Sequence, residues 1–409
     1  MSLIQSVYHF TINCNDVVFM ILLYFLACFG MALKKVESVD QKRWLGSCMG
    51  LSTVFLIMGL KDSWHFICGI FVCAIIIIKV GKRCHLAALV FMLSYLTVYR
   101  ILVRSTMDNT TNYRYINSIH MLVFLKIVGV AFEIHYSDEN KKSSENMKIK
   151  NDGEDSSNVD PTFSEILHYA FSFLGMHLGP YIRYRTYDDY LHLPFARAAG
   201  SSFTYKQMAL SLGYGSIHLF FQYTITQEFS SSSMLYKTMY IFITFENVHF
   251  WMYSIGSISE VIASSVGLGA YPEEGSNKSG HGPTKNYTEL RKMSLRKAII
   301  ARYDFKTLHS VDIMEAQFSP WIPETIKAWN KTGQYFMGMY VFKVLPSSWN
   351  KSLRACITLM ISALWHGIDS GYFIGLGLMP LYMPAETVFR KQQKKMTGWV
   401  STYPHLLEC

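Results

Sequence analysis

Five long apolar stretches follow one another in the first third of the sequence, and they constrain the fold more than any other feature. A helix needs about 20 consecutive apolar residues to cross the hydrocarbon core of a bilayer. The chain of 409 residues is 50% hydrophobic and only 16% charged, which argues against an ordinary soluble enzyme. The sequence therefore predicts an all-α, polytopic helical membrane protein of about ten membrane segments. The five stretches are Val17 to Leu33, Trp44 to Leu60, Trp64 to Ile78, Leu86 to Val103 and Ile119 to Ile134.

The basic residues indicate how these segments are oriented in the membrane. The net charge of +9 comes largely from short loops between apolar segments, so membrane topology explains it better than nucleic-acid binding. Lys34, Lys35, Lys42 and Arg43 follow the first segment, and Lys79, Lys82 and Arg83 follow the third. Both loops should therefore be cytoplasmic. The loop with the glycosylation pattern Asn109-Thr110-Thr111 should be lumenal.

Other parts of the chain predict its organisation. We expect one membrane-embedded domain over residues 1–409, interrupted by a mobile, polar cytoplasmic loop at 136–161. The eight cysteines show no CxxC spacing, so neither a disulfide framework nor a metal site is expected. Farther along, Glu324 to Leu345 should form a helix that follows Pro323 and ends at Pro346. A more apolar helix should run from Ile357 to Leu378.

His366 lies inside this second apolar segment. Acyl transfer to a hydroxyl needs a base, and burial keeps an imidazole neutral and able to accept a proton. Ser362 should lie one turn before His366, and Asp369 and Ser370 one turn after it on the same helix face. Gly367 would leave room for a substrate. The alternative is a buried histidine that only forms a hydrogen bond with a neighbouring helix.

Asn330 is the companion residue on the preceding predicted helix. Its amide could bind the substrate hydroxyl or a thioester carbonyl. The alternatives are a structural hydrogen bond between helices and a glycosylation acceptor, because Asn330-Lys331-Thr332 fits that pattern.

The pair Trp329-Asn330, followed by Trp365-His366-Gly367, resembles the membrane-bound O-acyltransferase (MBOAT) family. The stretches GPYIRYRTYDDYLHLPF (Gly179 to Phe195) and TIKAWNKTGQYFMGMYVFKVLP (Thr325 to Pro346) resemble its lysophosphatidylinositol acyltransferase branch.

This resemblance implies an enzyme of phospholipid remodelling with an intramembrane tunnel. His366 would be the catalytic residue and Asn330 its partner. The implied substrates are an acyl-CoA, with arachidonoyl-CoA as the donor typical of the branch, and lysophosphatidylinositol. We expect no bound cofactor and no metal, with acyl-CoA as co-substrate, and residence in the endoplasmic reticulum membrane. The family usually continues through further helices after the histidine, so we expect this chain to be short at its C-terminus.

Several further residues are candidates for substrate binding. Arg183 and Arg185 could bind the lysolipid phosphate, or could extend toward the membrane interface. The basic run from Arg291 to Lys306 could bind CoA phosphates, although positive-inside topology or binding to anionic lipid is the better explanation. Around the histidine, the candidates are Ser362, Trp365 and Asp369.

Alternative functions remain open. Within the same chemistry the acceptor could be another lysophospholipid, a diacylglycerol or a peptide. A transporter would also place His, Asn and Glu inside the membrane, but it would show paired broken helices in two related halves. A catalytically silent membrane scaffold is the third alternative.

Overall fold

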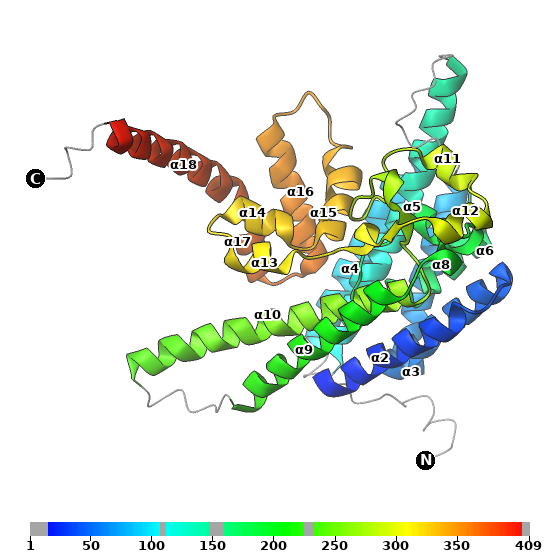
Figure 1. Ribbon diagram of the computed structural model, residues 1–409, viewed down its shortest axis with the longest axis horizontal. Helices are drawn as coiled ribbons and strands as arrows, with labels where there is room; N and C mark the ends of the chain where they lie inside the picture. The colour runs from blue at the N-terminus through cyan, green and yellow to red at the C-terminus, as the bar shows by residue number, and fades with distance from the viewer. Residues whose placement is uncertain (1–14, 107–111, 147–158, 225–232, 403–409) are drawn as a thin grey trace, which may run out of the picture. The chain divides into compact units, whose positions relative to one another are not determined.

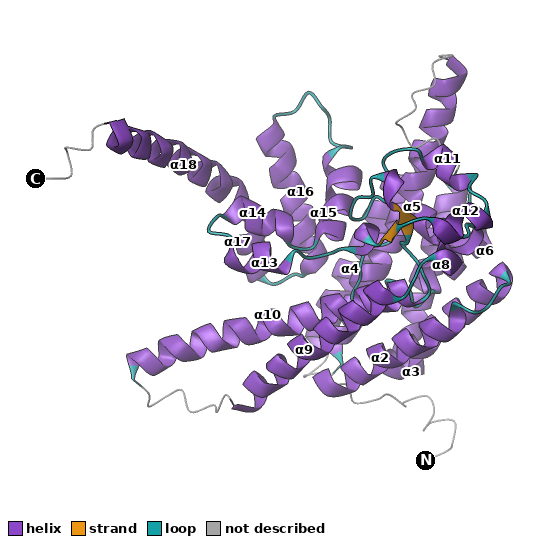
Figure 2. Ribbon diagram, viewed as in Figure 1, coloured by secondary structure: helices purple, strands orange, loops and turns teal. Residues whose placement is uncertain are grey.

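The computed structural model describes residues 15–106, 112–146, 159–224 and 233–402. Figure 2 shows that the described chain is helical apart from one short pair of strands, β1 and β2, in which Tyr271 lies opposite Asp304. This confirms the predicted fold class. The described residues group into two compact units, 1–311 with 331–336 and 312–330 with 337–409. A single domain over the whole chain stays a prediction.

Unit 1 contains the long apolar helices, which are coloured from blue to green in Figure 1. Its elements are α2 (Asp16–Leu33), α3 (Val39–Lys79), η1 (Gly81–Arg83), α4 (Cys84–Thr106), α5 (Tyr113–Asn146), α6 (Phe163–Phe171), α7 (Tyr184–His192), α8 (Phe195–Ala198), α9 (Ser202–Thr224), α10 (Met234–Ser265), β1 (Tyr271–Pro272), η2 (Glu273–Gly275), α11 (Tyr287–Arg291), α12 (Leu295–Ile300), β2 (Tyr303–Asp304), η3 (Lys306–Leu308) and residues 331–336 of α15 (Lys331–Met337).

Five helical segments of the described chain are long and apolar enough to cross a membrane, and they match the five predicted stretches. Two of them belong to α3, which changes direction at Gly59, where φ is 76° and ψ is 165°. At this break the amide of Asn112 donates a hydrogen bond of 2.9 Å to the carbonyl of Ile57.

The hydrogen bonds of unit 1 agree with the alternating directions of these five segments. At one end, Tyr115 at the start of α5 donates to Asp16 at the start of α2 over 2.8 Å. At the other end, Lys34 just beyond α2 donates to the carbonyl of Ala199 over 2.8 Å, and Arg43 pairs with Glu165. The α5 segment is the most enclosed, because 83% of the residues in its most apolar 18-residue stretch are buried, against 22% in that of α4.

One stretch differs from its predicted form, and a second is less helical than its apolar composition suggests. Helix α5 continues to Asn146, so the first part of the predicted loop at 136–161 is helical, while 147–158 lie outside the described residues. Glu and Lys are good helix formers in water, so a polar composition did not exclude a helix. The apolar stretch after Phe163 forms only the short helix α6, and residues 172–183 include no regular helix.

The non-helical stretch after α6 is held by a buried lysine. Lys126 of α5 is 1% exposed and donates to the carbonyls of Ser172 and Leu174 over 2.9 and 3.0 Å. These bonds provide partners for carbonyls that a helix would have satisfied by itself. Residues 172–183 lie at the end of the apolar stretch that begins at Phe163, but their hydropathy does not show which groups form hydrogen bonds with their backbone carbonyls.

Unit 2 contains the remaining helices. They are α13 (Ile313–Phe318), α14 (Ile322–Ala328), the π-helix η4 (Gly338–Phe342), α16 (Lys351–His366), α17 (Ser370–Gly377) and α18 (Met379–Thr402). The two long helices predicted in this region are both interrupted. The interruptions fall at Trp329-Asn330 and at Gly367 to Asp369, next to the two residues expected to carry the chemistry.

Candidate active site

Asn330 lies at the break between α14 and α15, with a φ of 46° in the left-handed region. Asparagine is one of the few residues with a side chain that enter this region readily. The next residue, Lys331, donates its backbone N–H to the carbonyl of Ser310 over 2.7 Å. Asn330 itself is half-buried and lies between two helices, so its side chain is not part of a helix face.

His366 is the last residue of α16 and is half-buried. Ser362 lies one turn before it on the same helix, as predicted. The backbone of Gly367 is fully extended, with φ and ψ of 177° and 179°, so the helix ends at the histidine. A histidine at a helix terminus is more accessible to a substrate than one in the middle of a continuous helix.

The predicted position of Asp369 and Ser370 was wrong. They do not lie one turn after His366 on the same face, because the helix ends at His366 and α17 begins at Ser370 with Asp369 as its N-cap. Gly367 and Ile368 were treated as helical because their apolar surroundings hide the break. Asp369 is exposed and remains a candidate only as a substrate-binding residue.

Aromatic rings surround the imidazole of His366. The ring of Tyr372 is stacked on it, with centroids 5.7 Å apart and planes at 15°, and the Trp365 ring lies 4.5 Å away at 63°. Trp365 is buried, so its position is determined by packing. A side chain at Gly367 would overlap the ring of Tyr372. These rings contact an imidazole at the end of a helix, and an imidazole is the side chain most often used as a general base.

Arg183 and Arg185 lie in unit 1, at the start of α7, and both are buried at 6% and 3% exposure. Both guanidinium groups donate to the carbonyl oxygen of His281, over 3.3 and 3.2 Å. Arg183 also lies 3.5 Å from the carboxylate of Glu133, and Arg185 lies over the ring of Tyr287 at 4.3 Å. Both side chains are therefore enclosed by other residues of unit 1. Their predicted contact with a phosphate remains untested.

Two acidic residues of this cluster were missed in the sequence. Glu133 of α5 accepts hydrogen bonds from the backbone N–H groups of Tyr184 and Arg185, over 2.8 and 3.1 Å. It therefore occupies the positive N-terminal end of α7. Asp189 accepts from the hydroxyls of Tyr271 and Tyr287, over 2.6 and 2.8 Å. A lone Glu in an apolar span was the available signal for Glu133, because such residues are expensive unless they have a role.

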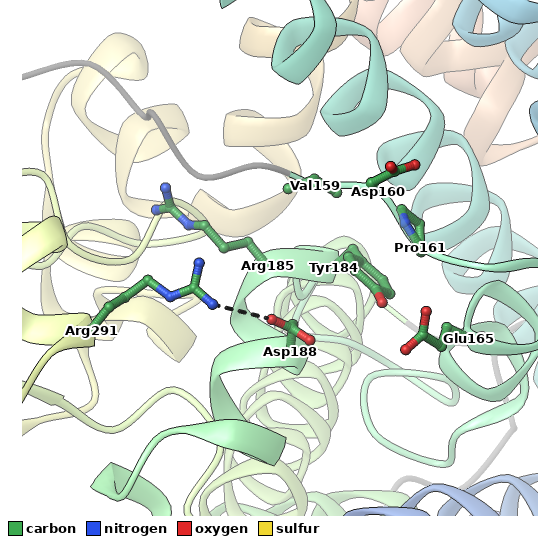
Figure 3. A pocket seen from close by; sticks show the side chains of 8 residues that line it. All are labelled: Val159, Asp160, Pro161, Glu165, Tyr184, Arg185, Asp188 and Arg291. Carbon is green, nitrogen blue, oxygen red and sulfur yellow. Dashed lines mark ion pairs between the residues drawn. The ribbon is translucent and has the colours of Figure 1, made fainter. Parts of the chain in front are cut away.

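A pocket of about 130 Å³ opens beside α7 (Figure 3). Arg185 and Arg291 lie on one side of it, whereas Asp160 and Glu165 lie on the other. Arg291 forms an ion pair of 3.7 Å with Asp188, so its charge is already partly matched within the protein. The lining residues are Val159, Asp160, Pro161, Glu165, Tyr184, Arg185, Asp188 and Arg291.

The described residues contain no group of three or more His, Cys, Asp or Glu side chains arranged to hold a metal ion. That the reaction uses no metal stays a prediction.

The O-acyltransferase hypothesis requires a helical membrane protein that carries a histidine and an asparagine, and the structure places both of these residues beside helix breaks. Comparison with known families agrees: residues 70–404 match the model of MBOAT, the membrane-bound O-acyltransferase family. The chain belongs to the membrane-bound O-acyltransferase family, and it is an integral membrane protein and an O-acyltransferase by that membership.

Similar proteins carry a more specific name, membrane-bound acylglycerophosphatidylinositol O-acyltransferase. A Drosophila melanogaster protein of that name, frj, is 28% identical over 407 residues, covering 94% of this chain and 80% of the relative. The Xenopus laevis protein mboat7 is 28% identical over 76% of this chain and 67% of its own length. The human protein MBOAT7 is 28% identical over 87% of this chain and 75% of its own length.

Proposed function

We propose that this protein transfers an acyl group from acyl-CoA to the free glycerol hydroxyl of lysophosphatidylinositol, in phospholipid remodelling at the endoplasmic reticulum membrane. The observation that carries the proposal is the similarity, over 94% of the chain, to a protein named for acylglycerophosphatidylinositol acylation. Both His366 and Asn330 lie within the range matched by the family. Arachidonoyl-CoA is the donor we select for the test.

His366 acts as the general base in this proposal. Its imidazole removes the proton from the glycerol hydroxyl while the oxygen attacks the thioester carbonyl. The new C–O bond forms as the C–S bond breaks, and the CoA thiolate takes the proton back from the imidazolium. The accessible helix end and the stacked ring of Tyr372 support this assignment.

Asn330 stabilises the oxygen that becomes negatively charged during the attack. An amide N–H is a suitable donor for such an oxyanion, and a donor held in position before the reaction contributes most. The left-handed backbone of Asn330 and the hydrogen bond from Lys331 to Ser310 support an Asn330 backbone that is held in position before the substrate reacts.

The remaining candidates are proposed to shape the binding site. Ser362, Trp365 and Asp369 adjoin His366 in the chain and would contact the reacting end of a substrate. Arg183 and Arg185 would act on the lysolipid headgroup indirectly. Both guanidinium groups are buried and donate hydrogen bonds to the carbonyl of His281, so they would hold the loop around His281 in place.

The test measures transfer of labelled arachidonoyl groups to a panel of lysophospholipids in membranes that contain the chain. His366→Ala and Asn330→Ala are compared at equal protein levels with the wild type. His192→Ala serves as the matched control, because His192 is a half-exposed histidine on α7. Tagged chain is localised in the same cells against a marker of the endoplasmic reticulum.

We expect transfer to lysophosphatidylinositol that His366→Ala abolishes. Asn330→Ala should lower it by about 100-fold, the loss typical of one oxyanion donor, and His192→Ala should leave it unchanged. Preference for another acceptor would overturn the proposed substrate. Transfer that survives His366→Ala would overturn the proposed base, and no transfer at all would favour a scaffold.

A further inference from the structure

Arg390 of α18 is the centre of a polar contact within unit 2 that the proposed reaction does not yet use. Its guanidinium group binds both carboxylate oxygens of Glu324 on α14, one of them over 2.8 Å. It also binds Glu386 over 3.1 Å and lies over the ring of Trp321 at 4.0 Å. We name these four residues, Trp321, Glu324, Glu386 and Arg390, the α14–α18 clasp.

Glu386 makes a second connection between the same two helices. Its other carboxylate oxygen accepts the backbone N–H of Ile322 over 3.1 Å, at the first residue of α14. The N–H groups at a helix start have no partner within the helix, so this bond replaces one that water would otherwise make. The clasp thus joins α14 and α18 in two ways, by a pairing of side chains and by a bond from a side chain to the backbone of α14.

The clasp differs from an ordinary surface ion pair, which contributes little to stability. A bidentate Arg–carboxylate pair has a defined geometry, and stacking on an aromatic ring restricts the guanidinium further. Arg390 and Glu324 are 25% and 33% exposed, so water reaches the pair only in part. Hydrogen bonding from Arg390 lowers the pKa of Glu324 to about 2, which keeps the carboxylate charged at neutral pH.

The position of the clasp in the chain is what connects it to the chemistry. Helix α14 ends at Ala328, and Trp329 and Asn330 follow immediately. In the other direction, His366 is followed by α17 and then by α18, which carries Glu386 and Arg390. The clasp therefore closes a loop of chain that contains both Asn330 and His366, each at a helix break.

A helix break gives a side chain access but removes the rigidity of a continuous helix. Hydrogen bonds between α14 and α18 restore this rigidity by limiting how the two breaks can move. Since a displacement of about 1 Å can cost about 100-fold in rate, small changes at the breaks matter.

We propose that Arg390 is a positioning residue, which holds the segments carrying Asn330 and His366 in the arrangement needed for acyl transfer. This inference rests on the proposed function for the roles of these two residues. Arg390 itself is not assigned to contact the substrate. Its effect should therefore appear in the rate of the chemical step more than in substrate binding.

The test uses Arg390→Lys and Glu324→Gln in the full chain. Lysine keeps the positive charge but loses the bidentate geometry and the planar stacking on Trp321. Lys391→Ala is the matched control, because Lys391 is the exposed basic neighbour on the same helix. Thermal unfolding of purified protein shows whether each variant is folded.

Two measurements are made on the folded variants. Steady-state kinetics with arachidonoyl-CoA and lysophosphatidylinositol give kcat and KM separately. Hydrogen–deuterium exchange on the purified protein follows peptides over residues 321–331 and 366–372, with peptides from α7 as the internal reference.

We expect both clasp variants to lower kcat by about tenfold or more, with both KM values unchanged within about twofold. They should speed exchange over 321–331 and 366–372 but not in α7, and Lys391→Ala should change neither readout. Exchange that stays at the wild-type rate overturns the positioning role even if the chain has no transferase activity. Faster exchange with unchanged kcat overturns it as well.

The failure of the proposed function would have a different pattern. In that case His366→Ala would leave transfer intact, whatever the exchange rates of the clasp variants. A loss of activity in His366→Ala with no effect of Arg390→Lys would leave the proposed function standing and overturn the clasp alone.

Discussion

Buried charges in unit 1 are held by specific partners, and Glu133 is the clearest case. Its side chain is fully enclosed within the protein, accepts hydrogen bonds from two backbone N–H groups of α7 and forms an ion pair of 3.5 Å with Arg183. Breaking a buried ion pair by removing one charge costs about 3–5 kcal/mol, because the other charge loses its partner.

We therefore expect Glu133→Gln to lower the thermal unfolding midpoint of detergent-solubilised protein strongly. Glu139→Gln on the same helix is the control, since its carboxylate is 61% exposed. Equal midpoints for both variants would show that Glu133 is not held as described.

His281 is a second single residue whose burial can be tested, in this case through the dependence of stability on pH. Burial, and then the charges of Arg183 and Arg185, lower its pKa from 6.5 to about 3. The unfolded chain binds a proton at this histidine as the pH falls below 6.5, whereas the folded protein does not until about pH 3. The folded state therefore loses stability across that interval as the pH falls.

Replacing His281 with Asn removes this proton uptake from the unfolded state. We expect the unfolding midpoint of His281→Asn to fall less steeply between pH 7 and pH 4.5 than that of the wild type, a range chosen to span most of the expected titration. Parallel pH profiles for the two proteins would contradict the assigned shift.

At the scale of elements, glycine sets how closely two helices approach. Gly50 of α3 faces α6 so closely that an added methyl group would overlap the carbonyl oxygen of Phe171. The neighbouring contact confirms the close approach, since Phe173 donates its N–H to the carbonyl of Gly46 over 3.2 Å. At Gly213 of α9, an added methyl group would meet no atom within 4 Å.

Gly50→Ala should therefore separate α3 from α6 and destabilise the protein by about 1–3 kcal/mol, the usual cost of overpacking. Gly213→Ala should be neutral or slightly stabilising, because alanine favours a helix. Both effects are measured as shifts in the thermal unfolding midpoint. A smaller shift for Gly50→Ala than for Gly213→Ala would contradict the packing of α3 on α6.

At the scale of the whole molecule, the hydrogen bonds that place Tyr115 beside Asp16 and Arg43 beside Glu165 agree with alternating directions of the five spans, and which side is cytoplasmic stays a prediction. The predicted lumenal acceptor, Asn109, lies outside the described residues. We expect a glycosylation scan to modify Asn109 but not an acceptor site engineered at Asp160. The opposite pattern would reverse the assigned orientation.

The first five spans could be predicted from the sequence because crossing a bilayer requires length and apolar character, and both are properties of consecutive residues. The family resemblance likewise depended on short local patterns around Asn330 and His366. These features need no knowledge of which distant residues meet.

The tertiary structure decided the features that depend on distant partners. Lys126 satisfies the carbonyls of Ser172 and Leu174, so the chain can leave the helical form inside an apolar stretch. The helix break next to Asn330 was missed for the same reason, since Lys331 bonds to the carbonyl of the distant Ser310. The break after His366 was missed because its neighbours are apolar. Residue order determined that the chain enters the membrane, whereas contacts between residues far apart in sequence decided where it leaves the helical form after α6, because Lys126 replaces hydrogen bonds that a helix would have made.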